Sequence, residues 1–414
     1  MKILYVSPFF PPVIGGVESV LETTCKELTE QGHEVRVLTS PVKGVPLHEY
    51  VGRYLVQRST LLQIPYNGIV SGDQFDFYRI ANFIREITSD FEPDIVHFHN
   101  YQMRRYSMFL SAFVYGLDRK YPTLDTLHND ADDSFTHYTL TYTPLDRIVS
   151  VTSRAAMQLL SAGVSPERVS VVPNMINSQK FRAARGSRLR SKLGVRDDEC
   201  LILFPSRIIG REGSLLLDAT DGKGLTTLIQ SLPEILEVDP TVKLLLLGND
   251  TIFSEKMQET KMKLGRIVER IAGKNCLVFL NEDVPNSLLP EVFAASDIVA
   301  SFGERETFGL VFLEGMAAGK PVVGVNSTFG GVAEAVPDGR AGYLVPPNDP
   351  HAIAKVISKL VVDEDLRKQL GLNGIKWVNG KFDAKIVLPK LLSLYHMTTR
   401  DIESDRVLPT TSTD

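Results

Sequence analysis

Short runs of β-branched and apolar residues alternate with helix-length segments along almost the whole chain, and this alternation limits the fold more than any other feature of the sequence. The runs recur from residues 2–7 to 169–172, and the same rhythm restarts from residues 201–205 to 342–345. Strands that alternate with helices form right-handed βαβ units, which build parallel sheets. The sequence therefore predicts an α/β fold with two Rossmann-like, doubly wound parallel-sheet domains, whose ligands bind at the carboxyl ends of the strands.

A polar, basic stretch near residues 173–198 separates the two series of strands. The 414 residues are enough for two domains with full cores. We expect an N-terminal domain at 1–180 and a C-terminal domain at 198–382, with a hinge between them. A helix at about 383–396 is expected to pack back on the first domain, and the polar tail at 401–414 is expected to be disordered.

The charge and cysteine content exclude several classes of protein. With 45 basic and 50 acidic residues, the chain has a net charge of -5, which does not favour nucleic acid as a partner. Its three cysteines are isolated, so they predict neither a metal-binding CxxC motif nor a disulfide scaffold, and they fit a cytoplasmic protein. No apolar run reaches transmembrane length, whereas peripheral membrane contact stays open.

Two adjacent glycines, Gly15 and Gly16, follow the first predicted strand and open a helix. Such a pair lets backbone N–H groups approach an anion closely at the positive end of the helix dipole. A tight turn explains the same pair equally well. The GxGxxG fingerprint of dinucleotide-binding proteins is missing, which counts against a dehydrogenase.

A second segment, at residues 303–323, leaves a predicted strand, turns, and enters a helix near Phe308. Glu306 precedes this helix and Glu314 lies within it, so the two carboxylates are not spaced as the facing acid and base of a glycosidase. The backbone N–H groups of Phe308, Gly309 and Leu310 are predicted to be free to hold a diphosphate.

The Glu-x7-Glu spacing of Glu306 and Glu314, the Gly15–Gly16 pair and the distal segment 328–339 resemble the retaining glycosyltransferases of family 4, which have the GT-B fold. The resemblance runs from Met1 to about residue 395. It implies two domains that face each other across a cleft. It also implies transfer of a sugar from a nucleotide-diphosphate sugar, of UDP or GDP type, to a hydroxyl acceptor with retention of configuration in carbohydrate biosynthesis. The nucleotide sugar is then a substrate, and neither a metal nor another cofactor is expected.

The same resemblance assigns roles to individual residues. Arg207 and Lys223 would grip the donor diphosphate, as concentrated negative charge requires. The loop at 208–222 is longer than is usual in the family, so Arg211 is an alternative or a supplement to Lys223. Glu306 would contact hydroxyls of the donor sugar and Glu314 those of the ribose. By the same resemblance His128 projects towards the reacting sugar, where it would orient and hydrogen-bond.

Other features leave alternatives open. Asp130, Asp132 and Asp133 follow His128 and are predicted to favour an acceptor with a cation or many hydroxyls, although the same residues are suited to cap the next helix. His97 and His99 share one face of a strand, and we expect one to be buried and hydrogen-bonded and the other to line the cleft. The acceptor is a small molecule, a glycan or a lipid-linked hydroxyl. A sugar phosphorylase or synthase, and a non-catalytic nucleotide-sugar-binding protein, remain alternatives.

Overall fold

The computed structural model describes residues 1–63, 75–104, 106–205, 221–247, 254–274, 276–280 and 284–407. The chain divides into two compact units. The first unit consists of Met1–Met175 and the segment that starts at Ala384, and the second consists of Ile176–Asp383. The chain therefore leaves the first unit between Met175 and Ile176, slightly before the predicted limit of residue 180, and returns to it at Ala384.

The first unit is built on an eight-stranded sheet in the order β3-β4-β2-β1-β5-β6-β7-β8, with every neighbouring pair parallel except β3 and β4. Its strands are β1 Lys2–Ser7, β2 Glu34–Thr39, β3 His48–Val51, β4 Tyr54–Arg58, β5 Ile95–His99, β6 Thr123–Leu127, β7 Arg147–Ser150 and β8 Val169–Val171. Its α-helices are α1 Gly16–Glu30, α2 Phe77–Phe91, α3 Ser107–Leu117, α4 Ser134–Tyr142, α5 Ser153–Ser161 and α16 Ala384–Val407.

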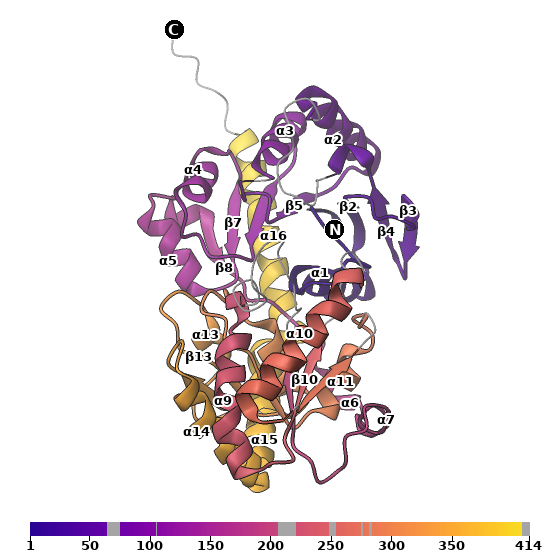
Figure 1. The fold of residues 1–414 in the computed structure, drawn as a ribbon. Coiled ribbons are helices and arrows are strands. Elements are labelled where there is room, and N and C mark those ends of the chain that lie inside the picture. The colour runs from indigo at the N-terminus through magenta and orange to yellow at the C-terminus, as the bar shows by residue number, and fades with distance from the viewer. Residues whose placement is uncertain are drawn as a thin grey trace. The chain divides into compact units, whose positions relative to one another are not determined.

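Side chains that alternate along these strands form a separate apolar core on each face of the sheet. On one face, Ile3, Ile95 and Leu124 pack with residues of α1 and α16, including Leu21 and Leu388. On the other face, the apolar side chains pack with those of α2 and α3. Figure 1 shows α16, in yellow, against the sheet of the first unit, where the expected helix at about 383–396 lies.

Two expectations for the first unit need correction. The hairpin of β3 and β4 was not predicted. Its strands are short, β3 is largely exposed, and a two-residue turn at Gly52 and Arg53 joins them, with Gly52 at a φ of 61°. The tail was expected to be disordered from residue 401, but α16 continues to Val407. Residues 408–414 lie outside the described part of the chain.

The second unit has a six-stranded, wholly parallel sheet in the order β11-β10-β9-β12-β13-β14. Its strands are β9 Leu201–Phe204, β10 Lys243–Leu247, β11 Leu277–Leu280, β12 Ile298–Ala300, β13 Val322–Val325 and β14 Gly342–Val345. Its helices are α6 Ser178–Ala183, α7 Ser187–Lys192, the 3₁₀ helix η4 Asp221–Lys223, α9 Leu225–Val238, α10 Ser254–Ala272, α11 Leu289–Ala295, α12 Leu310–Ala317, α13 Val332–Ala335, α14 Pro350–Val362 and α15 Glu364–Lys381. Each unit thus has the predicted doubly wound α/β architecture.

The helices of the second unit cover both faces of its sheet. α9 and α14 pack on one face, with Leu228 and Ile357 among the core residues. On the other face, α12 lies so close to β12 and β13 that a Cβ added at Gly315 would approach the side chains of Val299 and Val322 to 3.0 and 3.1 Å. This packing fixes the position of α12 relative to the strand ends. None of the described helices is long and apolar enough to cross a membrane.

Candidate functional site

The strand order of the second sheet reverses between β9 and β12, which are neighbours in the sheet but far apart in sequence. In doubly wound folds, ligands bind beyond the carboxyl ends of the strands at such a reversal. Here the loop after β12 meets η4, because the N–H of Phe302 donates to the carbonyl of Lys223 at 3.0 Å. A Cβ at Gly303 would lie 2.8 Å from the carbonyl oxygen of Gly222, so the two loops leave no room for a side chain there.

Lys223 and Glu306, which sequence reasoning placed at the donor site, come together at this edge of the sheet. The Lys223 ammonium forms an ion pair with Oε2 of Glu306. The other carboxylate oxygen, Oε1, accepts a hydrogen bond of 3.2 Å from the N–H of Gly309. The Lys223 side chain remains 48% exposed and that of Glu306 20% exposed, so both groups can still be reached by a ligand.

The N-terminus of α12 lies next to this pair. Its N-cap is Gly309, whose φ of 81° favours glycine and which has no side chain to accept hydrogen bonds from the first turn. Of the three N–H groups predicted to hold a diphosphate, that of Gly309 is already bonded to Glu306. Phe308 is buried, with its ring packed edge-on against Phe382 at 5.6 Å. The N–H groups of Leu310 and Val311, in the first turn of α12, have no partner within the helix and can bind an anion.

A third loop, which follows β13, holds the backbone of Glu306. The N–H of Gly331 donates to the carbonyl of Glu306 at 2.9 Å. A Cβ at Gly330 would lie 2.8 Å from that same carbonyl oxygen, so the close approach requires glycine. In the sequence, segment 328–339 contributes only to the family resemblance. Its glycines in fact place the loop that carries Glu306.

Glu314 lies in the second turn of α12 and is only 5% exposed. Burial raises the pKa of its carboxyl to about 8, while the charge of Lys180 on α6 opposes this shift. Among the described residues, no hydrogen bond to its carboxylate is formed. Glu314 is thus predominantly protonated at neutral pH and has hydrogen-bonding capacity that the described residues do not use.

In the first unit, the strand order reverses between β1 and β5, and Gly15 and Gly16 follow β1. Gly15 is in an extended conformation, and a Cβ at Gly16 would meet no described atom within 4 Å. Neither backbone strain nor packing therefore explains why position 16 is a glycine. The preceding loop is fixed by the buried Arg58, which donates to the carbonyl of Pro11 at 2.8 Å.

His128 follows β6 at the same edge of the first sheet, and its N–H donates to Oδ1 of Asn100 at 2.9 Å. Its Nε2 lies 2.9 Å from Nδ1 of His99, the last residue of β5. Burial lowers the pKa of His128 to about 4, so its imidazole is neutral at pH 7. The expectation for the other two histidines was half right. His97 is buried with both ring nitrogens hydrogen-bonded, but His99 is buried as well and contacts His128.

The remaining predicted residues have different positions. Asp133 is the N-cap of α4 and accepts a hydrogen bond of 2.9 Å from the N–H of Thr136, which is the capping role considered as the alternative. Asp132 is exposed and Asp130 is half-buried in the same loop. Arg207 and Arg211 lie outside the described residues. Within the described ranges, no three His, Cys, Asp or Glu side chains converge as they would around a metal ion.

Comparisons with known proteins match both halves of the chain. A model of glycosyltransferase family 4 matches residues 14–180, and a model of the glycosyl transferases group 1 matches residues 218–377. The chain is 24% identical to N-acetyl-alpha-D-glucosaminyl L-malate synthase of Bacillus anthracis, over 96% of this chain and 97% of that protein. It is 26% identical to phosphatidyl-myo-inositol mannosyltransferase of Mycobacterium leprae, over 95% and 96% respectively. The solved structure of Anabaena HepE in complex with UDP is similar with a TM-score of 0.70 and 19% identity, over 96% of this chain and 100% of that one.

Proposed function

This chain belongs to the family-4 glycosyltransferases, and from that premise we propose that it transfers a sugar from a nucleoside-diphosphate sugar to a hydroxyl acceptor, with retention of configuration and without a metal ion. The predicted family and the GT-B fold class are confirmed. A UDP- or GDP-linked sugar is the proposed donor, and the UDP bound to HepE supports the first of these. The two curated relatives are named for different acceptors, so the acceptor is proposed only as a hydroxyl compound.

One observation carries the proposal: Lys223, Glu306 and the N-terminus of α12 meet at the strand reversal of the second sheet. A nucleoside diphosphate has concentrated negative charge on its phosphates, and an ammonium group and a helix N-terminus both stabilise such charge. Lys223 is paired with Glu306 in this structure. A bound diphosphate would attract the ammonium and leave the Glu306 carboxylate available to hydroxyls of the donor sugar.

The proposed reaction is a displacement at the anomeric carbon. The acceptor oxygen forms the new glycosidic bond on the face from which the nucleoside diphosphate departs, and the bond between the anomeric carbon and the phosphate oxygen breaks. The hydroxyl proton passes to an oxygen of the departing phosphate, so no protein base is consumed. Lys223 and the α12 N-terminus then stabilise the charge that develops on the diphosphate. The Glu306 carboxylate would stabilise positive charge that develops on the sugar ring.

Two further residues have proposed roles in donor binding. Glu314, whose carboxyl is protonated at neutral pH, can both donate to and accept from the ribose hydroxyls. At Gly16 a side chain is absent although neither the backbone nor the packing demands it, which supports close approach of a ligand. The three buried free thiols, Cys25, Cys200 and Cys276, support a reducing, cytoplasmic location.

A thermal-shift panel of UDP-, GDP-, ADP- and TDP-sugars, with and without EDTA, tests the proposal. The matching donor at 100 times its Kd is expected to stabilise the protein by about 2.7 kcal/mol, with equal shifts in EDTA. Release of nucleoside diphosphate should follow, and NMR of the product should show the anomeric configuration of the donor. No stabilisation and no release with any donor would refute the proposed function. An inverted product or complete inhibition by EDTA would refute the corresponding part.

A further inference from the structure

An arginine and a phenylalanine contact each other at the carboxyl ends of the strands of the second sheet, beside the proposed donor site. The guanidinium of Arg305 lies over the ring of Phe329, 5.7 Å from the ring centre. The exposed fraction of Phe329 is 52%, and Arg305 is exposed as well. Both members of the pair are therefore accessible to a ligand.

Two loops of the second unit hold this pair next to Glu306. Arg305 directly precedes Glu306 in the loop after β12. Phe329 lies in the loop after β13, where its N–H donates to Oγ of Ser327 at 3.0 Å. The two loops touch at Gly330, where a Cβ would lie only 2.8 Å from the carbonyl oxygen of Glu306. Backbone contacts thus keep the two loops, and the pair that they carry, close to the Glu306 carboxylate.

Lys223 and Arg305 make their contacts on opposite sides of the loop that carries Glu306. The 3₁₀ helix η4, which contains Lys223, follows β9 in the chain, whereas Phe329 follows β13. β9 and β13 are the two neighbours of β12 in the sheet. Glu306 forms its ion pair with Lys223, and the residue before it, Arg305, contacts Phe329. In the order of the strands, one cation therefore lies on each side of the carboxylate that is proposed to bind the donor sugar.

A guanidinium stacked on an aromatic ring keeps its hydrogen-bonding edges available. The ring contacts the face of the cation, whereas the five N–H donors lie in the plane of the cation. Such an arginine can keep contacts within the protein and still bind a carboxylate or a phosphate through two parallel N–H···O bonds. Stacking also restricts the side chain, so less conformational entropy is lost when an anion binds.

We propose that Arg305, held by Phe329, binds a second anionic group of the substrates, a carboxylate or a phosphate, next to the sugar that is transferred. This inference rests on the proposed function, in which Lys223 binds the diphosphate and Glu306 binds the sugar. The anionic group belongs either to the donor sugar, as in a nucleoside-diphosphate uronic acid, or to the acceptor. In both cases Arg305 contacts the substrate directly and determines specificity, and Phe329 is a positioning residue.

The test compares anionic ligands with neutral ligands that lack the charged group. In the donor arm, titration calorimetry of the full-length protein gives Kd for UDP-glucuronate and UDP-glucose, or for GDP-mannuronate and GDP-mannose, according to which nucleoside diphosphate binds. In the acceptor arm, glucose 6-phosphate, glucuronate and glucose are titrated into protein saturated with that nucleoside diphosphate. We expect the anionic ligand to bind roughly tenfold more tightly in one arm, since hydrogen bonds to an exposed charge contribute about this factor. The arm that shows the preference identifies the source of the anionic group.

Variants of the pair test which residues produce this preference. Arg305→Met should abolish it. Phe329→Leu should reduce it roughly two- to fivefold, which is the contribution of an exposed cation–π contact, and Phe329→Tyr, which keeps the ring, should retain it. Arg340→Met is the matched control, because Arg340 is exposed in the turn before β14, at the opposite ends of the strands, and should leave the preference unchanged.

Several results would overturn the inference. Equal Kd values for the anionic and the neutral ligands in both arms would do so, as would a preference that survives in Arg305→Met. An equal loss in Arg340→Met would show that the preference reflects the overall charge of the protein and not a site at Arg305. If neither UDP nor GDP binds to the wild type, the proposed function has failed and this inference with it. If one of them binds and the preference is missing, only this inference has failed.

Discussion

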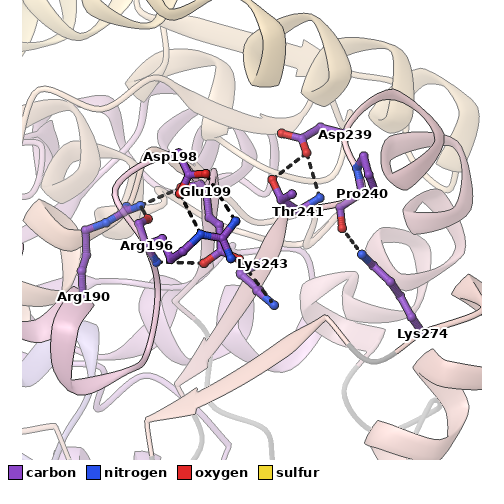
Figure 2. Close-up of polar contacts among 9 residues, drawn as sticks. All are labelled: Arg190, Arg196, Asp198, Glu199, Asp239, Pro240, Thr241, Lys243 and Lys274. Atoms are coloured by element: carbon purple, nitrogen blue, oxygen red, sulfur yellow. Dashed lines mark hydrogen bonds and ion pairs between the residues drawn. The ribbon is translucent and has the colours of Figure 1, made fainter.

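Charged residues lie at both ends of β9 and β12 in the second sheet, at the amino ends of the strands (the amino edge) and at their carboxyl ends (the carboxyl edge). The surroundings of these charges differ between the two. At the amino edge of β9 and β12, the buried Arg190 donates to Asp297 and to three backbone carbonyls at 2.6–2.9 Å. Figure 2 shows Arg190 beside Arg196 and Glu199, with Lys243 contributing a further charge to Glu199. At the carboxyl edge, Lys223 and Glu306 stay partly exposed, and the Glu314 carboxyl is buried without a described hydrogen bond.

This difference distinguishes charged residues that stabilise the fold from charged residues that are available to bind a ligand. Both edges have ion pairs, so the presence of a pair does not distinguish them. What distinguishes them is whether described protein groups accept the hydrogen bonds, as four acceptors do for the two terminal nitrogens of Arg190, or leave polar groups to a ligand. Substitutions at the amino edge should therefore change stability, and substitutions at the carboxyl edge should change activity.

The largest effect is expected for Arg190→Met. Loss of the buried guanidinium removes one donor from the Asp297 carboxylate and from each of three carbonyls, so the free energy of unfolding of the second unit should fall by about 3–5 kcal/mol. Urea denaturation measures this. The control is Arg196→Met, whose side chain is 60% exposed and should cost under about 1 kcal/mol. Equal denaturation midpoints for the two variants would contradict the structural role of the amino edge.

Glu306→Ala should produce the opposite pattern. Removal of the carboxylate is expected to lower kcat roughly 100- to 1,000-fold, as for loss of one group that stabilises transition-state charge. The melting temperature should change little, because the lost ion pair is partly exposed. Glu304→Gln, in the same loop and hydrogen-bonded to Asn348, is the control and should keep full turnover. Turnover by Glu306→Ala at the wild-type rate would show that the donor site is not at the carboxyl edge.

Lys223→Met should weaken donor binding more than it slows the chemical step. A hydrogen-bonded charge contributes about 1.5–3 kcal/mol, and the partial exposure of Lys223 reduces this, so KM for the donor should rise roughly tenfold. Lys243→Met, at the opposite edge of the same sheet, should leave KM unchanged. If the two lysine variants gave the same KM, the diphosphate would have to be held by other groups.

Glu314→Gln should change stability in a way that depends on pH, and by little at pH 5, where the carboxyl is protonated in the folded wild type. The pKa of Glu314 is raised from 4.5 to about 8, so between these values the native state binds more protons than the unfolded state and stability falls as pH rises. The variant lacks this proton uptake. Its advantage over the wild type should therefore grow between pH 5 and 8, by at most about 1.4 kcal/mol per pH unit. Urea midpoints that differ by a constant amount across this range would show that Glu314 is ionised throughout.

Much of the fold could be predicted because its signals are local. Buried strands such as residues 201–204 are continuous apolar runs, and parallel sheets need them to be. The hairpin of β3 and β4 was missed because His48–Val51 is short and mostly exposed, so burial imposes little pattern on it. Gly52, in the two-residue turn between the strands, was the one available signal.

The candidate site was predictable in its membership but not in its contacts. The resemblance to family 4 assigned Lys223 and Glu306 to one site, and the structure brings them together. The sequence could not reveal that Glu306 accepts a hydrogen bond from the N–H of Gly309, since this bond depends on side-chain geometry within the loop. The contact of His99 with His128 was likewise out of reach, because the register of β5 and β6 is set by packing across the sheet.

The return of the chain to the first unit has a consequence for the order of biosynthesis. The core of this unit includes Val387, Leu391 and Tyr395 of α16, which leave the ribosome only after the whole second unit has been made. At ~5–20 residues per second, translation of the intervening two hundred or so residues takes roughly 10–40 s. Throughout that interval, Ile3, Tyr5 and Leu124 lack the helix that covers them. The nascent first unit is therefore the stage of synthesis at which a chaperone would have apolar surface to bind.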